Sequence, residues 1–451
     1  MTSGFPPRRV ALATLAAAAF FFLYFFGLTR TGLIGPDEPR YAAIGRAMEA
    51  TGDWITPRLW EQAWFEKPAF LYWMTATGFK LGLGPDLAPR LPVALASVAF
   101  LIYFLAVLRR EFGDRAAWYS ATILATSAGW LAYSHIALTD LPMSAALGAA
   151  MLTIFASADT RAFLVAGVLL GIAVLAKGLV PLVLFIPALW FLRHRLRDLV
   201  ILCTTAVVIA APWYVLVTLR NGTPFLEDFF WKHHFGRFLN SALQHQQPVW
   251  FYVPILLAGL FPWTPLVLLL FQRRLYQDKR AMFLMVWVAW TFLFFSASRN
   301  KLPGYLLPLV PPLAALMGIA LADASRARVL LAACGALLCL APPLAQMLPQ
   351  ALSAGVSHAT FRVSWPGILV GLALAFNCIQ WDRAGRRNIA VGIVAVSITV
   401  CVVGLVWRVY PELDRQLSGR TSGSITCLPP TNRSQRYSLD YYAGRNLPDC
   451  K

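Results

Sequence analysis

Charged residues are scarce in this chain, and acidic residues are the scarcer kind. Asp, Glu, Lys and Arg make up 13% of the 451 residues, against about 25% in soluble domains, so the composition excludes an ordinary soluble protein. The 39 Lys and Arg outnumber the 21 Asp and Glu, which leaves a net charge of +18. The basic residues lie in short segments between apolar runs. That is the positive-inside pattern of a membrane protein, and it argues against a nucleic-acid partner.

Metal-type spacings of cysteine and histidine are also lacking. The chain has 7 cysteines and 6 histidines, and the cysteines are scattered singly rather than in close pairs. Five of them fall inside apolar runs, where cysteine behaves as a small hydrophobic residue. Cys427 and Cys450 are the pair outside the runs, and they can form a disulfide if the polar tail that carries them is extracytoplasmic.

Long hydrophobic runs, by contrast, fill the sequence, which is 58% hydrophobic with a mean hydropathy of +0.61. A membrane-spanning helix needs about 20 apolar residues. Thirteen segments fit this requirement: 10–28, 88–108, 117–137, 142–158, 162–176, 178–192, 199–217, 250–271, 281–297, 302–321, 328–348, 365–381 and 388–408. The sequence therefore predicts an all-α polytopic membrane protein with about thirteen spans.

The least certain boundary is Lys177-Gly178, which either splits one long helix or separates two short ones. Two helices place every arginine cluster on the side of the N-terminus, whereas one helix breaks this agreement from Arg193 onward. We therefore expect two helices and a cytoplasmic N-terminus. Residues 1–408 then form the transmembrane unit, and residues 409–451 form a short segment on the outer side.

Two segments on the predicted outer side, 29–87 and 218–249, are too long to be turns. In the first, Asp37 and Gly52 are typical residues for the start and the end of a helix. Apolar residues share one face of that helix, which predicts an interfacial helix lying on the bilayer. These residues are Tyr41, Ile44 and Met48.

Carboxylates follow directly on two of the apolar spans. Asp37 and Glu38 come after the first span, and Asp140 lies between the third and the fourth. A carboxylate at bilayer depth costs about 2–4 kcal/mol, so it is rare without a function. Helix capping is the simpler explanation for the pair Asp37 and Glu38, but it accounts for one acid well and for two acids less well. Asp37 and Asp140 are the predicted catalytic residues, because both reach the outer face from different helices.

Several cations are predicted on the same outer side. Lys177 stands alone between apolar runs and needs an anionic partner, unless it extends to the interface. Lys67 follows Glu66, for which an ordinary surface ion pair is the alternative, and His234 alone is more often structural than functional. The cationic set is Arg40, Lys67, Lys177, Arg237 and Lys301.

Cations beside a cavity at the level of the bilayer suit a lipid phosphate, and carboxylates beside them suit a general base or the stabilisation of a sugar cation. The residues therefore indicate transfer of a group from a phosphorylated lipid on the outer leaflet. A lipid or solute transporter is the alternative from another class. It is less favoured because the acids lie at helix ends and the chain shows no internal repeat.

The motifs of the first 320 residues resemble those of bacterial GT-C glycosyltransferases. The relatives are the protein O-mannosyltransferase family and, more closely, the aminoarabinose transferases that modify lipid A. The resemblance rests on Pro36-Asp37-Glu38-Pro39-Arg40-Tyr41, Gly52-Asp53-Trp54, Phe65-Glu66-Lys67-Pro68, Ala176-Lys177-Gly178, His234 with Arg237-Phe238, and Lys301-Leu302-Pro303 with Tyr305.

The resemblance implies a GT-C fold with periplasmic interfacial helices, a polyprenyl-phosphate sugar such as an undecaprenyl-phosphate sugar as donor, and an acceptor reached from the periplasm of a bacterial inner membrane. It makes Asp37 the essential acid of an inverting transfer. It also assigns Arg40, Tyr41, Lys67, Arg237 and Tyr305 to the donor phosphate cavity. Glu66 and His234 match positions that can hold a divalent metal, zinc or magnesium.

The chain departs from these relatives at its end, because only about 43 residues follow the last span where the relatives carry a sizeable periplasmic domain. The tail keeps Tyr437-Ser438-Leu439 and Tyr441-Tyr442-Ala443-Gly444-Arg445, which are similar to the opening of that domain. An envelope lipid such as lipid A is the expected acceptor, and protein O-glycosylation of the mannosyl type is the alternative.

Overall fold

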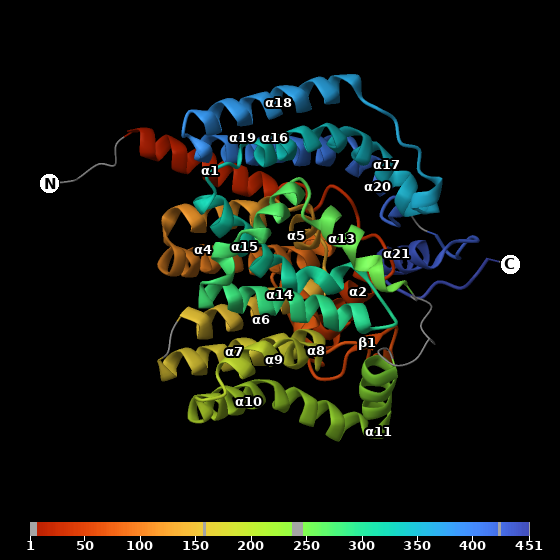
Figure 1. The fold of residues 1–451 in the computed structure, drawn as a ribbon. Coiled ribbons are helices and arrows are strands. Elements are labelled where there is room, and N and C mark those ends of the chain that lie inside the picture. Colours follow the sequence, from red (N-terminus) through yellow and green to blue (C-terminus); the bar gives the residue numbers. More distant parts are fainter. Residues whose placement is uncertain (1–6, 157–158, 237–246, 423–424, 451) are drawn as a thin grey trace.

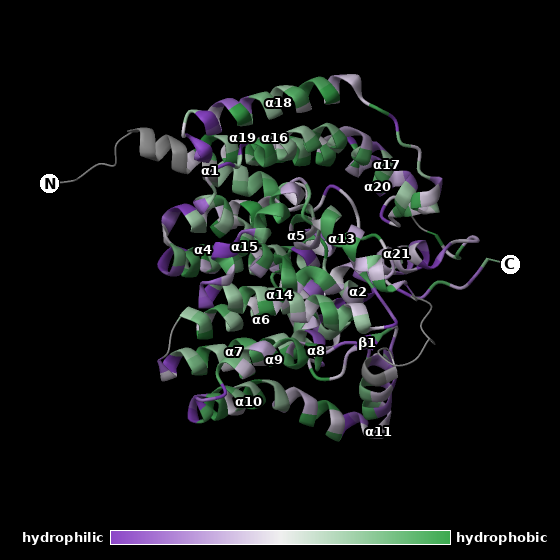
Figure 2. Cartoon of the chain, in the orientation of Figure 1, coloured by the Kyte–Doolittle hydropathy of each residue, from purple (hydrophilic) through white to green (hydrophobic). Residues whose placement is uncertain are grey.

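The computed structural model describes residues 7–156, 159–236, 247–422 and 425–450, and it is built almost wholly of helices. The long helices run side by side (Figure 1). Figure 2 shows hydrophobic residues along the middle of these helices and hydrophilic residues gathered at their two ends. A helical bundle with an apolar middle is what a bilayer requires, because every backbone group must be paired within its own helix. The predicted fold class is confirmed.

Within the described residues, seven helices are long and apolar enough to cross a membrane, and a pair bent by 111° would make eight. The bent pair is Val249–Gly259 with Thr264–Phe271. The seven are α4 (Gly84–Thr126), α7 (Thr160–Lys177), α10 (Leu196–Asn221), α14 (Lys279–Ala297), η5 with α15 (Pro303–Asp323), α16 to α17 (Arg328–Ala354) and α19 (Arg387–Arg408).

The remaining elements are shorter or more polar. They are α1 (Pro7–Tyr24), α2 (Glu38–Thr51), β1 (Arg58–Leu59), β2 (Gln62–Ala63), α3 (Phe70–Lys80), α5 (Ala128–Ser134), α6 (Asp140–Ala156), α8 (Val180–Leu184), α9 (Ile186–Phe191), α11 (Thr223–Leu226), η1 (Glu227–Gly236), η2 (Val249–Phe251), α13 (Tyr252–Gly259), η3 (Thr264–Phe271), η4 (Arg273–Tyr276), η6 (Leu338–Leu340), η7 (Val356–His358), α18 (Trp365–Arg383), α20 (Tyr410–Leu417) and α21 (Arg433–Ala443).

Each of the thirteen predicted spans coincides with helical structure, but fewer of them are continuous helices of spanning length. The predicted span 178–192 consists of two short helices, α8 and α9, each with a proline in its first turn. The predicted spans 88–108 and 117–137 lie on either side of Gly113 (φ 82°), where α4 is bent, and the second is interrupted at Ser127 before α5. Proline divides a helix because it cannot continue the hydrogen-bonded pattern, and glycine permits the left-handed backbone at the bend.

The chain reverses direction at Gly178, as the two-helix prediction requires. Gly178 has a φ of 73° and ends α7. After α8 and α9 the chain returns to the start of α7, where the Arg195 guanidinium lies 4.7 Å from the ring of Phe163. Thr160 also donates a hydrogen bond to Asp198 over 3.4 Å. The helices α7 and α10 then pack directly on each other.

The outer segment 29–87 folds over one end of the bundle. Helix α2 begins after Asp37 and ends at Gly52 (φ 69°), as predicted. Its apolar face, Tyr41, Ile44 and Met48, is almost fully buried. This face contacts protein, chiefly α3, rather than lipid, and Gly45 allows the close approach because a Cβ there would lie 2.5 Å from Thr75. The protein contact differs from the predicted placement on the bilayer.

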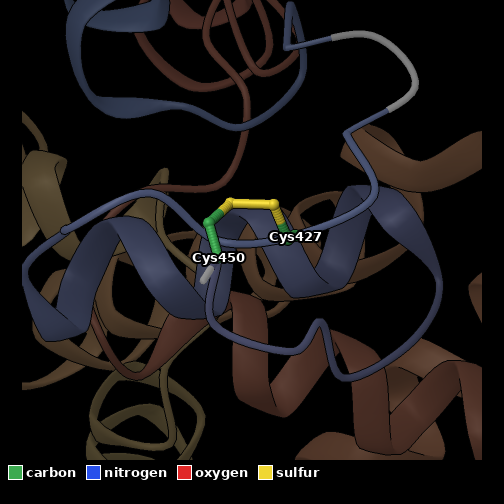
Figure 3. Close-up of a disulfide and its surroundings, with 2 residues drawn as sticks. All are labelled: Cys427 and Cys450. Atoms are coloured by element: carbon green, nitrogen blue, oxygen red, sulfur yellow. A yellow bond between two sulfur atoms is a disulfide. The ribbon is translucent and has the colours of Figure 1, made fainter.

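The tail lies at the same end of the bundle as α2 (Figure 1). Its helix α21 packs on α2, and α20 leads into it from α19. Cys427 and Cys450, on either side of α21, form a disulfide, the pairing that the sequence left open (Figure 3). Because α21 packs on α2, the part of the tail that the disulfide closes lies beside the segment 29–87.

Candidate functional site

Two carboxylates and two cations form a connected cluster at the start of α2. The guanidinium of Arg40 donates to Asp37 on one side and to Glu66, 3.2 Å away, on the other. Glu66 also accepts from the Lys67 ammonium over 3.0 Å. The side chains of Arg40 and Glu66 are buried and that of Lys67 is largely so, whereas that of Asp37 is 37% exposed. Asp37 makes no capping hydrogen bond with its side chain, so the capping explanation fails.

Aromatic rings surround Arg40. Its guanidinium carbon lies 5.3 Å from the ring of Trp64, 5.9 Å from that of Tyr41 and 5.0 Å from that of Tyr437 in the tail. Burial would lower the pKa of Arg40, but the negative charges of Glu66 and Asp37 outweigh it and raise that pKa. Burial, together with the same carboxylates, also raises the pKa of Tyr41, so its phenol stays protonated as a hydrogen-bond donor.

Glu38 serves a different purpose from its neighbour. Both of its carboxylate oxygens accept from Arg90 over 2.8 Å, and they also accept from the backbone amides of Ile34 and Ala137. Arg90 in turn donates to the carbonyls of Leu28, Thr31 and Gly32. Glu38 is 1% exposed. This pair fastens the outer segment to α4 and leaves no lone pair of Glu38 for chemistry.

A second carboxylate–cation pair joins α6 to α7. The Lys177 ammonium donates to Asp140 and lies 4.7 Å from the centre of the Tyr305 ring. The lone membrane lysine thus has the anionic partner that the sequence required, and both side chains are largely buried. Asp140 also approaches Gly304, where a Cβ would lie 2.7 Å from its Oδ1 and 2.6 Å from the Tyr133 hydroxyl.

Tyr133 on α5 lies beside the Asp140–Lys177 pair, since its hydroxyl and the Asp140 carboxylate both approach Gly304. The negative charges of Asp140 and Asp37 both act on its phenol. Residues from α2, α5, α6, α7 and η5 therefore meet at one end of the bundle. Lys301 lies just before η5, almost fully buried, and donates to the carbonyls of Ser298 and Gln247.

Two of the predicted site residues fall outside what the structure describes. Arg237 belongs to the segment 237–246, and the side chain of His234 is likewise outside the described set. In the described part of the chain, no group of three or more His, Cys, Asp or Glu side chains is arranged to hold a metal ion. Glu66 already contacts the two cations Arg40 and Lys67, whose charges oppose a divalent metal at the same carboxylate.

Three residues of this region were not identified from the sequence. Arg90, like Lys177, is a single charge next to apolar residues. Because Arg90 lies at the start of the predicted span 88–108, it could not be distinguished from an ordinary charge at a helix end. Tyr133 has no sequence signal at all. Tyr437 appeared only within a tail motif, and its contact with Arg40 spans almost the whole chain.

A family model and characterised transferases both match this chain in sequence. Residues 66–217 match the family described as dolichyl-phosphate-mannose-protein mannosyltransferase. The chain is 34% identical over 340 residues to undecaprenyl phosphate-alpha-4-amino-4-deoxy-L-arabinose arabinosyl transferase 2 of Pseudomonas fluorescens, over 70% of this chain and 57% of the relative. It is 34% identical over 335 residues to the transferase of the same description from Pseudomonas aeruginosa, over 69% of this chain and 60% of the relative. The chain thus spans less than two thirds of the length of these relatives.

Solved structures agree with this. ArnT from Cupriavidus metallidurans bound to undecaprenyl phosphate superposes with a TM-score of 0.77 at 26% identity, over 97% of this chain and 85% of that chain. The Archaeoglobus fulgidus oligosaccharyltransferase in its apo form superposes with a TM-score of 0.52 at 12% identity, over 97% of this chain and 64% of that chain. The latter likeness concerns the fold alone.

Proposed function

Because the chain belongs to the GT-C glycosyltransferases of the aminoarabinose transferase and protein mannosyltransferase type, we propose that it transfers a sugar from a polyprenyl-phosphate donor to an envelope lipid. The observation that carries the proposal is the meeting of Asp37, Arg40, Asp140 and Lys177 at one end of an apolar bundle. The donor is an undecaprenyl-phosphate sugar, since that is the substrate named for the relatives.

Asp37 is the group that can meet an acceptor. Its carboxylate is partly exposed, whereas Arg40 and Glu66 behind it are buried. In the proposed step the acceptor oxygen attacks the anomeric carbon of the sugar. The bond from that carbon to the phosphate oxygen breaks, and the polyprenyl phosphate leaves with the electron pair. A hydroxyl acceptor gives its proton to Asp37, and a phosphate acceptor needs only to be oriented. One displacement inverts the anomeric carbon.

The donor phosphate needs a cation that is not already neutralised by a carboxylate of the two clusters. Asp37 and Glu66 balance Arg40 and Lys67, and Asp140 balances Lys177, so each cluster is neutral by itself. Lys301 lies outside both clusters, and its ammonium donates to the backbone carbonyls of Ser298 and Gln247. We assign Lys301 to the phosphate, together with Arg237, and Tyr41 and Tyr305 to the cavity around it. Asp140 places the acceptor or the sugar.

The proposal places the site on the periplasmic side of a bacterial inner membrane, with a cytoplasmic N-terminus and residues 409–451 outside. Two features support this. The disulfide Cys427–Cys450 lies at the site's end of the bundle, and structural disulfides belong to oxidising compartments. Arginine-bearing loops meet at the other end, where Arg280 donates to the carbonyl of Glu111. A bulky maleimide should label the reduced tail cysteines in intact spheroplasts, and labelling only after lysis would reverse the orientation.

Reconstitution tests the function directly. The purified chain in vesicles with undecaprenyl-phosphate aminoarabinose and lipid A should yield a lipid A one pentose derivative heavier by mass spectrometry. The match to the mannosyltransferase family over residues 66–217 favours protein as the second acceptor class. A parallel reaction with a mannosyl donor and an acceptor protein therefore distinguishes the two. Movement of a lipid across the vesicle with no cleavage of any donor would identify a transporter instead.

The Asp140–Lys177 pair can be disturbed without removing either residue. Gly304→Ala places a methyl group within 2.7 Å of Asp140 and Tyr133, so one of them must move. Overpacking of this kind costs about 1–3 kcal/mol, and we expect a fall in transfer rate of about tenfold or more. Gly392→Ala is the matched control, because a Cβ there meets nothing within 4 Å. Equal rates for the two variants would remove Asp140 from the proposed site.

A further inference from the structure

The tail helix α21 is bound to the segment that precedes Asp37. Ser438 donates to the carbonyl of Leu33 over 2.7 Å, and the Tyr442 hydroxyl accepts from the amide of Leu33 over 2.8 Å. The Tyr441 hydroxyl donates to the carbonyl of Pro85 over 2.7 Å. These bonds pair a helix near the end of the chain with both ends of the outer segment 29–87.

A second set of contacts comes from α20 and the residues that follow it. Asp414 accepts from the amide of Gly32 over 2.6 Å. Arg420 donates to Asp414, to Asp86 over 3.0 Å and to the carbonyl of Thr29 over 2.8 Å. The backbone just before Asp37 is therefore held in place by residues about 400 positions away.

From this anchored helix, Tyr437 reaches the buried cation of the proposed site. The Arg40 guanidinium carbon lies 5.0 Å from the centre of the Tyr437 ring. Its nitrogens donate to the carbonyl of Pro36, to Glu66 and to Asp37. Three hydrogen-bond acceptors and three neighbouring rings leave the Arg40 guanidinium little freedom to move.

We infer that Tyr437 is a positioning residue for transfer: its ring fixes Arg40, and through Arg40 it fixes the carboxylate of Asp37. This inference rests on the proposed function, since Asp37 must take part in the reaction for its placement to matter. The tail is then part of the site and not an appendage. In this chain a helix of 11 residues does this within a tail of about 43 residues.

Three substitutions at Tyr437 distinguish the effect of the aromatic ring on kcat from the effects of side-chain volume and of the hydroxyl. Tyr437→Phe keeps the ring and should retain kcat within about twofold. Tyr437→Leu keeps much of the bulk without a π face and should lower kcat about 5- to 30-fold, the range expected for loss of a buried cation–π contact. Tyr437→Ala should be at least as low. The KM for the donor should change little in each, because the donor phosphate is assigned to other residues.

Gln435→Ala is the matched control, on the same helix and away from Arg40. It should keep the activity of the unaltered chain. Two results would overturn the inference: unaltered kcat in Tyr437→Leu, or an equal loss in Tyr437→Phe and Tyr437→Leu. Melting temperatures of all variants show whether the tail stays folded, and a loss of kcat with unchanged melting supports the positioning role.

A stability measurement keeps the inference separate from the proposed function. If the unaltered chain and Gln435→Ala transfer no sugar from any donor, the proposed function fails. The contact is then judged by melting temperatures of Tyr437→Leu, Arg40→Lys and the double variant. Non-additive shifts support the fixing of Arg40 by Tyr437, and additive shifts contradict it.

Discussion

Replacing Asp37 by Asn is expected to lower kcat about 10²- to 10⁴-fold while the protein folds normally. The range is that of a general base. The amide keeps the shape of the side chain but cannot accept the proton of an acceptor hydroxyl, and it contributes no charge beside Arg40. Folding should survive because Asp37 is 37% exposed and because Arg40 keeps Glu66 as an ionic partner. Sugar transfer in vesicles and thermal unfolding in detergent measure the two effects separately.

The control for this substitution is Glu49→Gln on the same helix, where the side chain is exposed and lies outside both clusters. It changes the charge of α2 by the same amount without touching Arg40. Full activity in Asp37→Asn would refute the catalytic assignment of Asp37. A loss confined to hydroxyl acceptors, with phosphate acceptors still glycosylated, would show that Asp37 acts as the base and is not needed to orient the acceptor.

Replacing Glu38 by Gln should instead destabilise the protein by about 3–5 kcal/mol, the usual cost of removing one partner of a buried ion pair. The change leaves the Arg90 guanidinium, 3% exposed, without a counterion. It also weakens two charge-assisted hydrogen bonds of 2.8 Å. A large drop in melting temperature and in the amount of folded protein is the expected result, while the rate per folded molecule changes little.

Glu49→Gln again provides the comparison, since an exposed change of this kind stays within about 0.5 kcal/mol. An unchanged melting temperature in Glu38→Gln would mean that the pair does not hold the outer segment to α4. A stable but inactive Glu38→Gln would make Glu38 catalytic and would contradict the division of roles between these two adjacent acids.

Several features of the site were predictable because their signals are local in the sequence. Lys177 stands alone in an apolar stretch, so an anionic partner was required, and the partner is Asp140. Lys67 and Glu66 are neighbours and do form an ion pair, but the pair is also tied to Arg40 and is not the exposed pair of the simpler explanation.

The number of spanning helices was less predictable. Hydropathy counts apolar residues, but the prolines at the starts of α8 and α9 divide the predicted span 178–192 without removing its apolar character. The sequence of one helix likewise does not show whether its apolar face is buried against lipid or against protein. The apolar face of α2 satisfied the pattern of a bilayer-facing helix, yet α3 covers it.

The sequence by itself determined the class of protein, because long apolar runs and basic loops are properties of consecutive residues that the bilayer selects directly. It also singled out Asp37, Asp140 and Lys177, which the structure places at one end of the bundle. Only the tertiary structure decided that Glu38 pairs with Arg90 and that Tyr437 from the tail lies against the guanidinium of Arg40. These pairings join residues about 50 and about 400 positions apart. They depend on how helices pack, and neither periodicity nor spacing along the chain encodes that.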